Sequence, residues 1–209
     1  MKRPPASSRR TFLAQAAAAA LVGCAPAREG GGPSDEAPEP GPPRDCNPTP
    51  TNALGPFHRD GAPERTDLNP NGDEGARLVV SGTVSGPNCP EPLGVVDIEV
   101  WHSNLQGDYD NDGDAYAFRG RLSTAEDGSY SFETLLPGRY RDGDQFRPRH
   151  IHFLVTADGY EQLVTQLYFE DDEFNDVDAL FDPELARPLV DDGARGWTVV
   201  FDIVLAAPA

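Results

Sequence analysis

The chain has 209 residues, of which 38% are hydrophobic and 25% are charged, and it contains 21 glycines and 21 prolines. These proportions indicate one ordinary globular domain with an additional unfolded segment, and they exclude collagen-like, coiled-coil and multi-span membrane proteins. With 35 acidic and 17 basic residues the net charge is −18. Because phosphate backbones repel so acidic a chain, we expect no nucleic-acid partner.

The N-terminus predicts an export signal. Arg9 and Arg10 precede Thr-Phe-Leu and an apolar run at residues 14–22, which is shorter than the about 20 residues that span a bilayer. The paired arginines resemble a twin-arginine export signal, and Leu-Val-Gly-Cys at 21–24 resembles the lipobox of bacterial lipoproteins. The alternative is a chance Arg-Arg pair before an alanine-rich helix.

We therefore expect residues 1–23 to be a signal peptide that is removed on export, and Cys24 to be lipidated as the new N-terminus. This would anchor the protein in the bacterial cell envelope, on its periplasmic or cell-surface face, with the lipid as its only contact with the membrane. Residues 24–45 are dominated by proline, glycine and acidic residues, so they predict a disordered tether. Residues 46–209 then form one domain, long enough to bury a core.

Cys46 and Cys89 lie on either side of the first predicted strand. In an oxidising compartment two such cysteines can pair, and only one pairing is open to them once Cys24 is assigned to the anchor. The alternative is two free thiols.

From residue 77 onward, short alternating or β-branched runs are separated by turn signals, which is typical of β-strands. Seven such runs predict an all-β fold, a β-sandwich of about seven or more strands. They cover residues 78–84, 95–101, 118–123, 130–134, 150–156, 163–169 and 198–205. We expect residues 47–76 to form an irregular N-terminal arm across the sandwich. Helix should be scarce, with at most a turn or two at 182–189 between Pro183 and Pro188.

His150 and His152 share one predicted strand. Residues two apart on a strand point to the same face, roughly 6.5 to 7 Å apart, so both imidazoles could reach one metal ion while Ile151 and Phe153 enter the core. Histidines in this pattern can equally be surface or hydrogen-bonded polar groups, and the spacing leaves both interpretations open.

Tyr109 and Tyr140 each follow a glycine-containing turn. A phenol has a pKa near 10 in water, which makes it a poor zinc ligand at neutral pH, but trivalent iron is charged enough to bind it as phenolate. Either tyrosine could instead be an aromatic residue at the edge of the core with its hydroxyl in water.

Several segments, in this order and spacing, carry a resemblance to a known family. They are Leu-Gly-Pro-Phe at 54–57, the strand at 79–84, Val-Asp-Ile-Glu-Val-Trp at 96–101, Gly-Asp-Tyr at 107–109, Phe-Arg-Gly-Arg at 118–121, Asp-Gly-Ser-Tyr-Ser-Phe at 127–132, Pro-Gly-Arg-Tyr at 137–140, Arg-Pro-Arg-His-Ile-His-Phe at 147–153 and Thr-Gln-Leu-Tyr-Phe at 165–169. Together they resemble the intradiol ring-cleavage dioxygenases, the family of catechol and protocatechuate 3,4-dioxygenases.

The resemblance implies an oxidoreductase that inserts both atoms of O2 into a small aromatic diol of the catechol type and yields a muconate-type dicarboxylate. It implies a non-haem Fe(III) ion as the cofactor. By carry-over from the family, the metal ligands are Tyr109, Tyr140, His150 and His152, and the catalytic residues are Tyr140, Arg147 and Gln166. Tyr140 would act as a base that leaves the metal, Arg147 would stabilise negative charge on the ring, and Gln166 would lie beside the substrate.

The sequence also departs from the family pattern. The residues between Cys24 and the first strand are rich in proline and glycine, so we expect no helical dimerisation domain, and a homo-oligomer stays an open possibility. Residues 108–114 begin like a calcium-binding loop, but Arg119 stands where a bidentate glutamate is expected. We interpret this loop as an acidic loop near the mouth of the site, and calcium binding is the alternative.

Two other functions fit parts of the sequence. One is a non-catalytic β-sandwich binding module tethered to the cell envelope, in which the same strands serve only as a scaffold. The other is a zinc hydrolase, which is weaker because no Glu or Asp stands near the two histidines as a general base.

Overall fold

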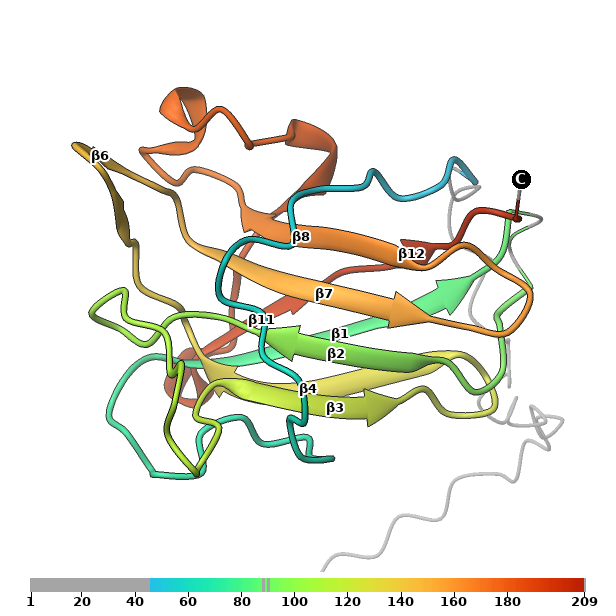
Figure 1. The fold of residues 1–209 in the computed structure, drawn as a ribbon, viewed down its shortest axis with the longest axis horizontal. Helices are drawn as coiled ribbons and strands as arrows, with labels where there is room; N and C mark the ends of the chain where they lie inside the picture. Colours follow the sequence, from blue (N-terminus) through green and yellow to red (C-terminus); the bar gives the residue numbers. More distant parts are fainter. Residues whose placement is uncertain (1–45, 88, 90, 209) are drawn as a thin grey trace, which may run out of the picture. The chain divides into compact units, whose positions relative to one another are not determined.

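The computed structural model describes residues 46–208 except residues 88 and 90. The predicted signal peptide, Cys24 and the tether lie outside these residues. The described residues fold into two five-stranded sheets and one short hairpin, which confirms the predicted all-β sandwich. In Figure 1 the longer strands run along the long axis of the picture.

The first sheet is built around β1 (Arg77–Ser85). The antiparallel strand β4 (Ser129–Leu135) pairs with one edge of β1. Two short strands, β11 (Trp197–Val200) and β12 (Ile203–Val204), pair in parallel with the other edge. The two-residue strand β10 (Val190–Asp191) extends this sheet beyond β11.

The second sheet carries the predicted histidines on its central strand. Its order is β3 (Arg119–Ser123), β2 (Asp97–Trp101), β7 (His150–Thr156), β8 (Leu163–Phe169) and β9 (Ala186–Arg187). The pairs from β3 to β8 are antiparallel, and β9 is parallel to β8. The separate hairpin joins β5 (Arg141–Asp142) to β6 (Gln145–Phe146), between Tyr140 and Arg147.

The core lies between the two sheets and follows the alternation of the strands. Leu78 and Val80 from β1 and Ile151 and Phe153 from β7 have no exposed surface. Burying a side chain of this size stabilises the fold by about 1.5 to 3 kcal/mol. Because successive side chains alternate, the core positions of β7 leave His150 and His152 on the outer face of the second sheet.

Within the described residues helix is scarce, as the sequence predicts, and consists of three short 3-10 turns, η1 (Asn175–Val177), η2 (Pro183–Leu185) and η3 (Gly193–Arg195). Only η2 lies in the segment 182–189 where a helical turn was expected. Asp182 caps η2 by accepting a hydrogen bond from the Glu184 amide, with Pro183 in the first turn. None of the helices in the described part of the chain has the length and hydropathy that a bilayer span requires.

The expected strand at 198–205 is wrong in one respect, because it breaks into β11 and β12 at Phe201 and Asp202. The Asp202 carboxylate accepts a hydrogen bond from the Thr83 amide at 2.8 Å in place of a backbone carbonyl. The Phe201 carbonyl also approaches β1 so closely that a Cβ at Gly82 would lie 2.1 Å from it. A glycine on β1 therefore permits the break. Among the two-residue strands, β12 lies within the predicted run, whereas β5, β6, β9 and β10 were not predicted from the sequence.

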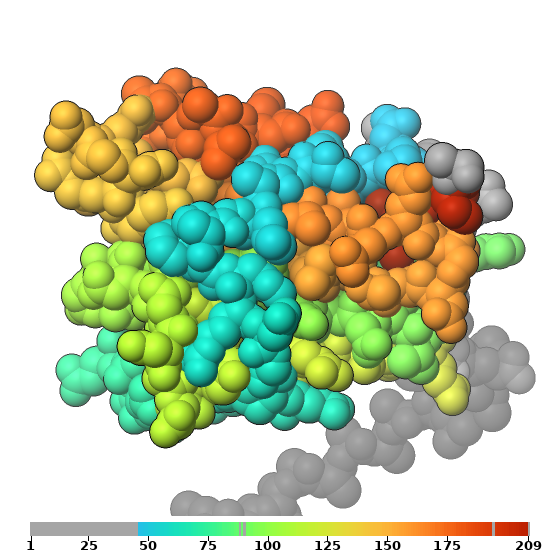
Figure 2. Space-filling view, viewed as in Figure 1, coloured from blue at the N-terminus to red at the C-terminus, as the bar shows by residue number. Residues whose placement is uncertain are grey.

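The N-terminal arm crosses the second sheet strand by strand. The Asn52 amide donates to the Val164 carbonyl on β8, and His58 contacts Glu99 on β2. Further along, the Arg65 amide donates to the Arg121 carbonyl on β3. Figures 1 and 2 show this segment, in cyan to teal, running across the front of the strands. The arm therefore covers the face that carries the two histidines.

A disulfide bond joins Cys46 to Cys89, with the Cα atoms 5.6 Å apart. It connects the start of the arm to the loop that follows β1. In Figure 1 β1 ends at the side of the sandwich opposite to the start of β7, so the disulfide and the histidines lie at different ends of the domain.

Candidate metal centre

The four side chains predicted as metal ligands meet at the start of β7. Their rings form a closed circle of contacts, with centroids 4.9 Å apart for His150 and His152 and 5.7 Å apart for His150 and Tyr140. Tyr109 completes the circle, 5.7 Å from Tyr140 and 6.2 Å from His152. Three separate segments supply them, namely the loop after β2, the loop before β5, and β7 itself.

His150 is oriented for coordination through Nε2. Its Nδ1 lies 2.7 Å from the Pro148 carbonyl, which can only accept, so Nδ1 carries the proton and donates it. Nε2 is then the unprotonated nitrogen, and it lies 3.2 Å from the Tyr109 hydroxyl. A backbone carbonyl that fixes the tautomer in this way is the usual support of a metal-binding histidine.

His152 is held between β2 and the arm. Its ring stacks on Trp101, the cross-strand partner of His152, with centroids 4.9 Å apart and planes 3° from parallel. On the arm side, a Cβ at Gly55 would lie 3.2 Å from His152 Cε1. His152 Nδ1 is buried and makes no hydrogen bond within the described residues.

Burial sets the protonation state of both imidazoles. It lowers the pKa of His150 to about 3, and the Arg147 charge acts in the same direction. Burial, followed by the effect of His150, holds the pKa of His152 well below its usual value, although the Ala53 carbonyl opposes the shift. Both imidazoles are therefore neutral near pH 7, which is the state that binds a metal.

The phenol of Tyr109 is protonated in the absence of a cation. Burial raises its pKa above the usual value, and Tyr140 adds to this effect while Arg147 opposes it. A bound cation would have to replace the phenol proton, so metal binding at this site should release a proton.

Arg147 connects the ring cluster to β8. Its Nη1 donates to the Tyr140 hydroxyl at 3.2 Å, and its Nη2 donates to Gln166 Oε1 at 3.3 Å. Nη2 also donates to the Tyr168 hydroxyl at 2.9 Å, and Nε pairs with Asp178 at 2.8 Å. Arg147 is 5% exposed, so it is a buried cation within reach of a predicted ligand and not a surface charge.

Gln166 is fixed between the arm and Arg147. It is in register with His152 across β7 and β8 and has no exposed surface. Its Nε2 donates to the Ala53 carbonyl at 2.7 Å, while Oε1 faces the arginine. The amide orientation follows from these two partners.

One carboxylate accepts hydrogen bonds from the residues directly before Tyr140 and His150. Asp172, in the segment after β8, accepts hydrogen bonds from Arg139 and Arg149 at 3.1 Å each, and its side chain is 2% exposed. These arginines directly precede Tyr140 and His150 in the chain. Asp172 therefore limits the movement of both residues.

The acidic loop is held by its own hydrogen bonds. The two carboxylate oxygens of Asp110 accept from the Gly113 and Ala117 amides at 2.7 Å each. Arg119, which is buried, donates to the Asp110 carbonyl at 2.6 Å. Across residues 46–208, leaving out 88 and 90, no three His, Cys, Asp or Glu side chains converge to hold a metal. At the ring cluster, the phenol oxygens are therefore the protein donors that would join the two imidazoles around a metal.

Sequence reasoning missed four residues around the cluster. Phe57 stacks on Tyr109 with centroids 4.3 Å apart, and Trp101 stacks on His152. Tyr168 lies two positions after Gln166, and this period-two spacing could have revealed that both side chains share a face of β8. Asp178 gave no signal, because its pairing with Arg147 depends on how the segment after β8 folds back.

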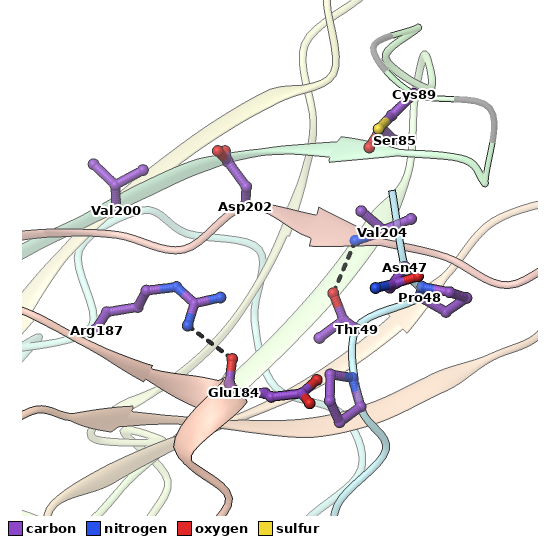
Figure 3. A pocket seen from close by; sticks show the side chains of 11 residues that line it. Asn47, Pro48, Thr49, Ser85, Cys89, Glu184, Arg187, Val200, Asp202 and Val204 are labelled. Atoms are coloured by element: carbon purple, nitrogen blue, oxygen red, sulfur yellow. Dashed lines mark hydrogen bonds between the residues drawn. The ribbon is translucent and has the colours of Figure 1, made fainter. Parts of the chain in front are cut away.

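A separate groove of about 560 Å³ lies where the arm begins, between the ends of β1 and β12 and the turn η2. In Figure 3 the Thr49 side chain accepts the Val204 amide, and Arg187 donates to the Glu184 carbonyl. The groove contains neither a histidine nor a tyrosine. It has no residue in common with the ring cluster, so it is not the predicted site.

Comparisons with known proteins identify the family of the chain. A family model described as "Dioxygenase" matches residues 54–207. The chlorocatechol 1,2-dioxygenase of Rhodococcus opacus is 36% identical over an alignment of 180 positions, and the match covers 72% of this chain and 70% of that protein. The 6-chlorohydroxyquinol 1,2-dioxygenase of Cupriavidus pinatubonensis is 32% identical, over 73% of this chain and 62% of that protein.

Among solved structures, the dioxygenase domain of a dioxygenase carbohydrate-binding protein fusion from Streptomyces sp. SirexAA-E superposes with a TM-score of 0.70 at 39% identity. The match covers 78% of this chain and 100% of that one. The fold and the family match together define a β-sandwich enzyme of the dioxygenase class. The chain belongs to the intradiol ring-cleavage dioxygenase family.

Proposed function

We propose that this protein is an Fe(III)-dependent intradiol dioxygenase that inserts both atoms of O2 into a catechol-type diol and yields a muconate-type dicarboxylate. The observation that carries the proposal is the circle of two partly buried phenols and two buried, neutral imidazoles, in which Tyr109 Oη lies 3.2 Å from His150 Nε2. Family membership supports the reaction class, and the names of the relatives support a catechol as substrate.

The donor set fits ferric iron. Phenolate oxygen is a hard, charged ligand that matches a trivalent ion, and imidazole is a suitable ligand for iron. Tyr109, Tyr140, His150 and His152 would hold the ion, with the tautomer of His150 already set by the Pro148 carbonyl. When bound, Fe(III) would act as a Lewis acid that draws electron density from a coordinated diol and makes the ring reactive toward O2.

The protein side chains would handle protons and charge. A diol that binds through both oxygens must lose its protons, and we assign Tyr140 Oη as one acceptor. Arg147 Nη1 already contacts this oxygen, so the arginine can stabilise negative charge on the phenolate and on the ring beside it. Gln166, buried next to Arg147, would limit where the ring lies.

The proposal is tested with the purified domain. We expect it to contain close to one iron per chain and to show a visible tyrosinate-to-iron absorption band. In air it should convert catechol, protocatechuate or hydroxyquinol into ring-opened products, and this panel of three substrates also identifies the ring substituents that the site accepts. Replacing His152 with Ala should remove the iron, whereas full iron occupancy in that variant would contradict the ligand assignment.

A non-catalytic binding module tethered to the cell envelope is the competing function. It predicts a colourless protein that contains no iron and cannot be reconstituted with ferric salts under conditions that load a related dioxygenase. That result would overturn the enzymatic proposal while leaving the β-sandwich intact.

We also propose that the enzyme is exported and anchored through a lipid on Cys24. The support is the order of the sequence signals, with paired arginines, a short apolar run and then Leu-Val-Gly-Cys. Whether one chain or a homo-oligomer is the active unit can be measured by analytical ultracentrifugation of the domain.

A further inference from the structure

Tyr168 lies where Arg147 meets Gln166, and it has no exposed surface. Its hydroxyl is 2.9 Å from Arg147 Nη2, 2.9 Å from Gln166 Oε1 and 3.1 Å from the Leu180 carbonyl. A phenol has one proton to donate and an oxygen that accepts. Because arginine can only donate, the hydroxyl accepts from Arg147 and gives its own proton to Gln166 or to Leu180.

Asp178 holds the opposite side of the same guanidinium. Its carboxylate lies 2.8 Å from Arg147 Nε, and the two side chains are 5% and 6% exposed. The other carboxylate oxygen accepts the Leu180 amide at 3.0 Å, which fixes the acid within its own turn. The pair is shielded from water, so the carboxylate stays close to the arginine.

We propose that Tyr168 and Asp178 are positioning residues, which together aim Arg147 Nη1 at the Tyr140 hydroxyl. The inference deepens the proposed function and rests on it. A guanidinium is planar and rigid, so fixing the donors Nε and Nη2 also determines where Nη1 points. Nη1 then meets Tyr140 at 3.2 Å without having to be ordered when substrate arrives.

Tyr168 also helps to fix the orientation of the Gln166 side-chain amide. With Oε1 facing the Tyr168 hydroxyl and Arg147, and Nε2 donating to the Ala53 carbonyl, each end of the amide has a suitable partner. A flipped amide would place its N–H groups against the arginine, which has no acceptor. Tyr168 and Arg147 therefore set the face that Gln166 presents to the site.

The decisive variant is Tyr168→Phe, which removes one hydroxyl and keeps the ring. Its matched control is Tyr130→Phe, since Tyr130 is also buried and its hydroxyl donates to the Phe201 carbonyl at 2.6 Å within the core. Both variants lose a buried hydrogen bond and should lose similar stability. Only Tyr168→Phe should lower kcat per bound iron, on the order of tenfold, with KM changed less than twofold.

A spectroscopic readout separates positioning from a loss of fold. The visible band of the resting iron protein depends on the surroundings of the tyrosinates, so Tyr168→Phe should shift this band while the iron content stays equal to that of the wild type. Tyr130→Phe should leave both unchanged. An unshifted band together with wild-type kcat per iron in Tyr168→Phe would overturn the inference.

Asp178→Asn tests the other half of the arrangement, because it keeps an acceptor and removes the charge. If both residues act through Arg147, neither Tyr168→Phe nor Asp178→Asn should lower kcat further in an Arg147→Ala background. Full additivity in that background would show that they act elsewhere. If the wild-type protein binds no iron and cleaves no ring, the proposed function itself is overturned. If the wild type is active and the variants are unaffected, this inference alone is overturned.

Discussion

At the scale of single residues, the site depends on contacts that fix a proton or a ring. The Pro148 carbonyl determines which nitrogen of His150 is free, and Trp101 keeps His152 in one plane by stacking on it. Burial keeps both imidazoles neutral and the Tyr109 phenol protonated. These residues are therefore ready to bind a cation that can displace the phenol proton.

Replacing Tyr140 with Phe should separate the binding of iron from catalysis. Three of the four ligands remain, so we expect most of the iron to be retained, but the phenol that takes a proton from the diol is lost. We predict that kcat/KM for catechol falls on the order of a hundredfold, measured by O2 uptake per iron. Tyr116→Phe is the control, because the Tyr116 hydroxyl donates to the Asp60 carbonyl, outside the ring cluster. Unchanged turnover in Tyr140→Phe would contradict the assigned role.

Replacing Gly55 with Ala should disturb His152 directly. Gly55 has a φ of +73°, and an added Cβ would lie 3.2 Å from His152 Cε1. We expect iron content per chain to fall severalfold, measured by metal analysis after dialysis.

The control for backbone strain is Gly72→Ala, because Gly72 has a φ of +67° with no atom within 4 Å of an added Cβ. Both variants should pay the cost of about 1 kcal/mol for a left-handed backbone. Equal iron loss in the two variants would show that contact with His152 is not the cause.

At the scale of elements, the two sheets are joined near the site by a buried histidine. His102 directly follows β2, and its Nε2 lies 2.7 Å from the Thr134 hydroxyl on β4. Its Nδ1 lies 2.7 Å from the Ser103 carbonyl, so the neutral ring donates from Nδ1 and accepts at Nε2. Burial lowers the pKa of His102 to about 4, with the Arg119 charge acting in the same direction and the hydrogen bond to Ser103 opposing it.

The stability of the domain should therefore depend on pH. His102 takes up a proton near pH 6.5 in the unfolded chain but only near pH 4 in the folded chain. The contribution of His102 to the unfolding free energy is therefore complete above pH 6.5 and is lost as the pH falls toward 4. At 1.36 kcal/mol per pKa unit, this loss is about 3 kcal/mol.

Urea unfolding at pH 7.5 and pH 4.5 measures this effect. His150 and His152 shift stability in the same direction, so the comparison is made with His102→Gln. Between the two pH values, the unfolding free energy of that variant should change by about 2 to 3 kcal/mol less than that of the wild type. Parallel pH dependence in the wild type and the variant would contradict the prediction.

The disulfide should stabilise the arm without taking part in the chemistry. It closes a loop with a sequence separation of 43 residues, for which loop-closure entropy gives about 4 kcal/mol. The double variant Cys46→Ser with Cys89→Ser should lose roughly this much unfolding free energy, measured by urea denaturation. Its kcat per iron should match that of the wild type, and a tenfold loss of turnover would show that the arm depends on the bridge to cover the site.

At the scale of the whole molecule, one sandwich supports the ring cluster at one end and carries the disulfide at the other. The arm connects the two ends and crosses the second sheet on the way, as Figure 2 shows. The net charge of −18 should disfavour anionic aromatic acids relative to neutral catechols at long range.

Export can be tested independently of activity. We predict that cells expressing the full chain incorporate labelled fatty acid into the protein and that Cys24→Ser abolishes this labelling. The Ser variant should move from the membrane fraction to the soluble fraction and keep its turnover per iron. A wild-type chain that carries no lipid would contradict the anchor.

The sequence by itself determined most of the longer strands and the two-sided alternation of β7. Alternating hydrophobicity is a local property, so the face shared by His150 and His152 follows from their spacing alone. The strand at 150–156 agrees with β7 to the residue. The family resemblance added Tyr109 and Tyr140, which no local pattern brings to the same place.

Only the tertiary structure decided which distant groups meet. Trp101 stacks on His152 because β2 and β7 pair in one particular register, and Asp178 reaches Arg147 because the segment after β8 folds back. The break at Phe201 and Asp202 likewise depends on a glycine of another strand. Such contacts join residues far apart in the chain, and their geometry depends on packing between elements that no local sequence pattern records.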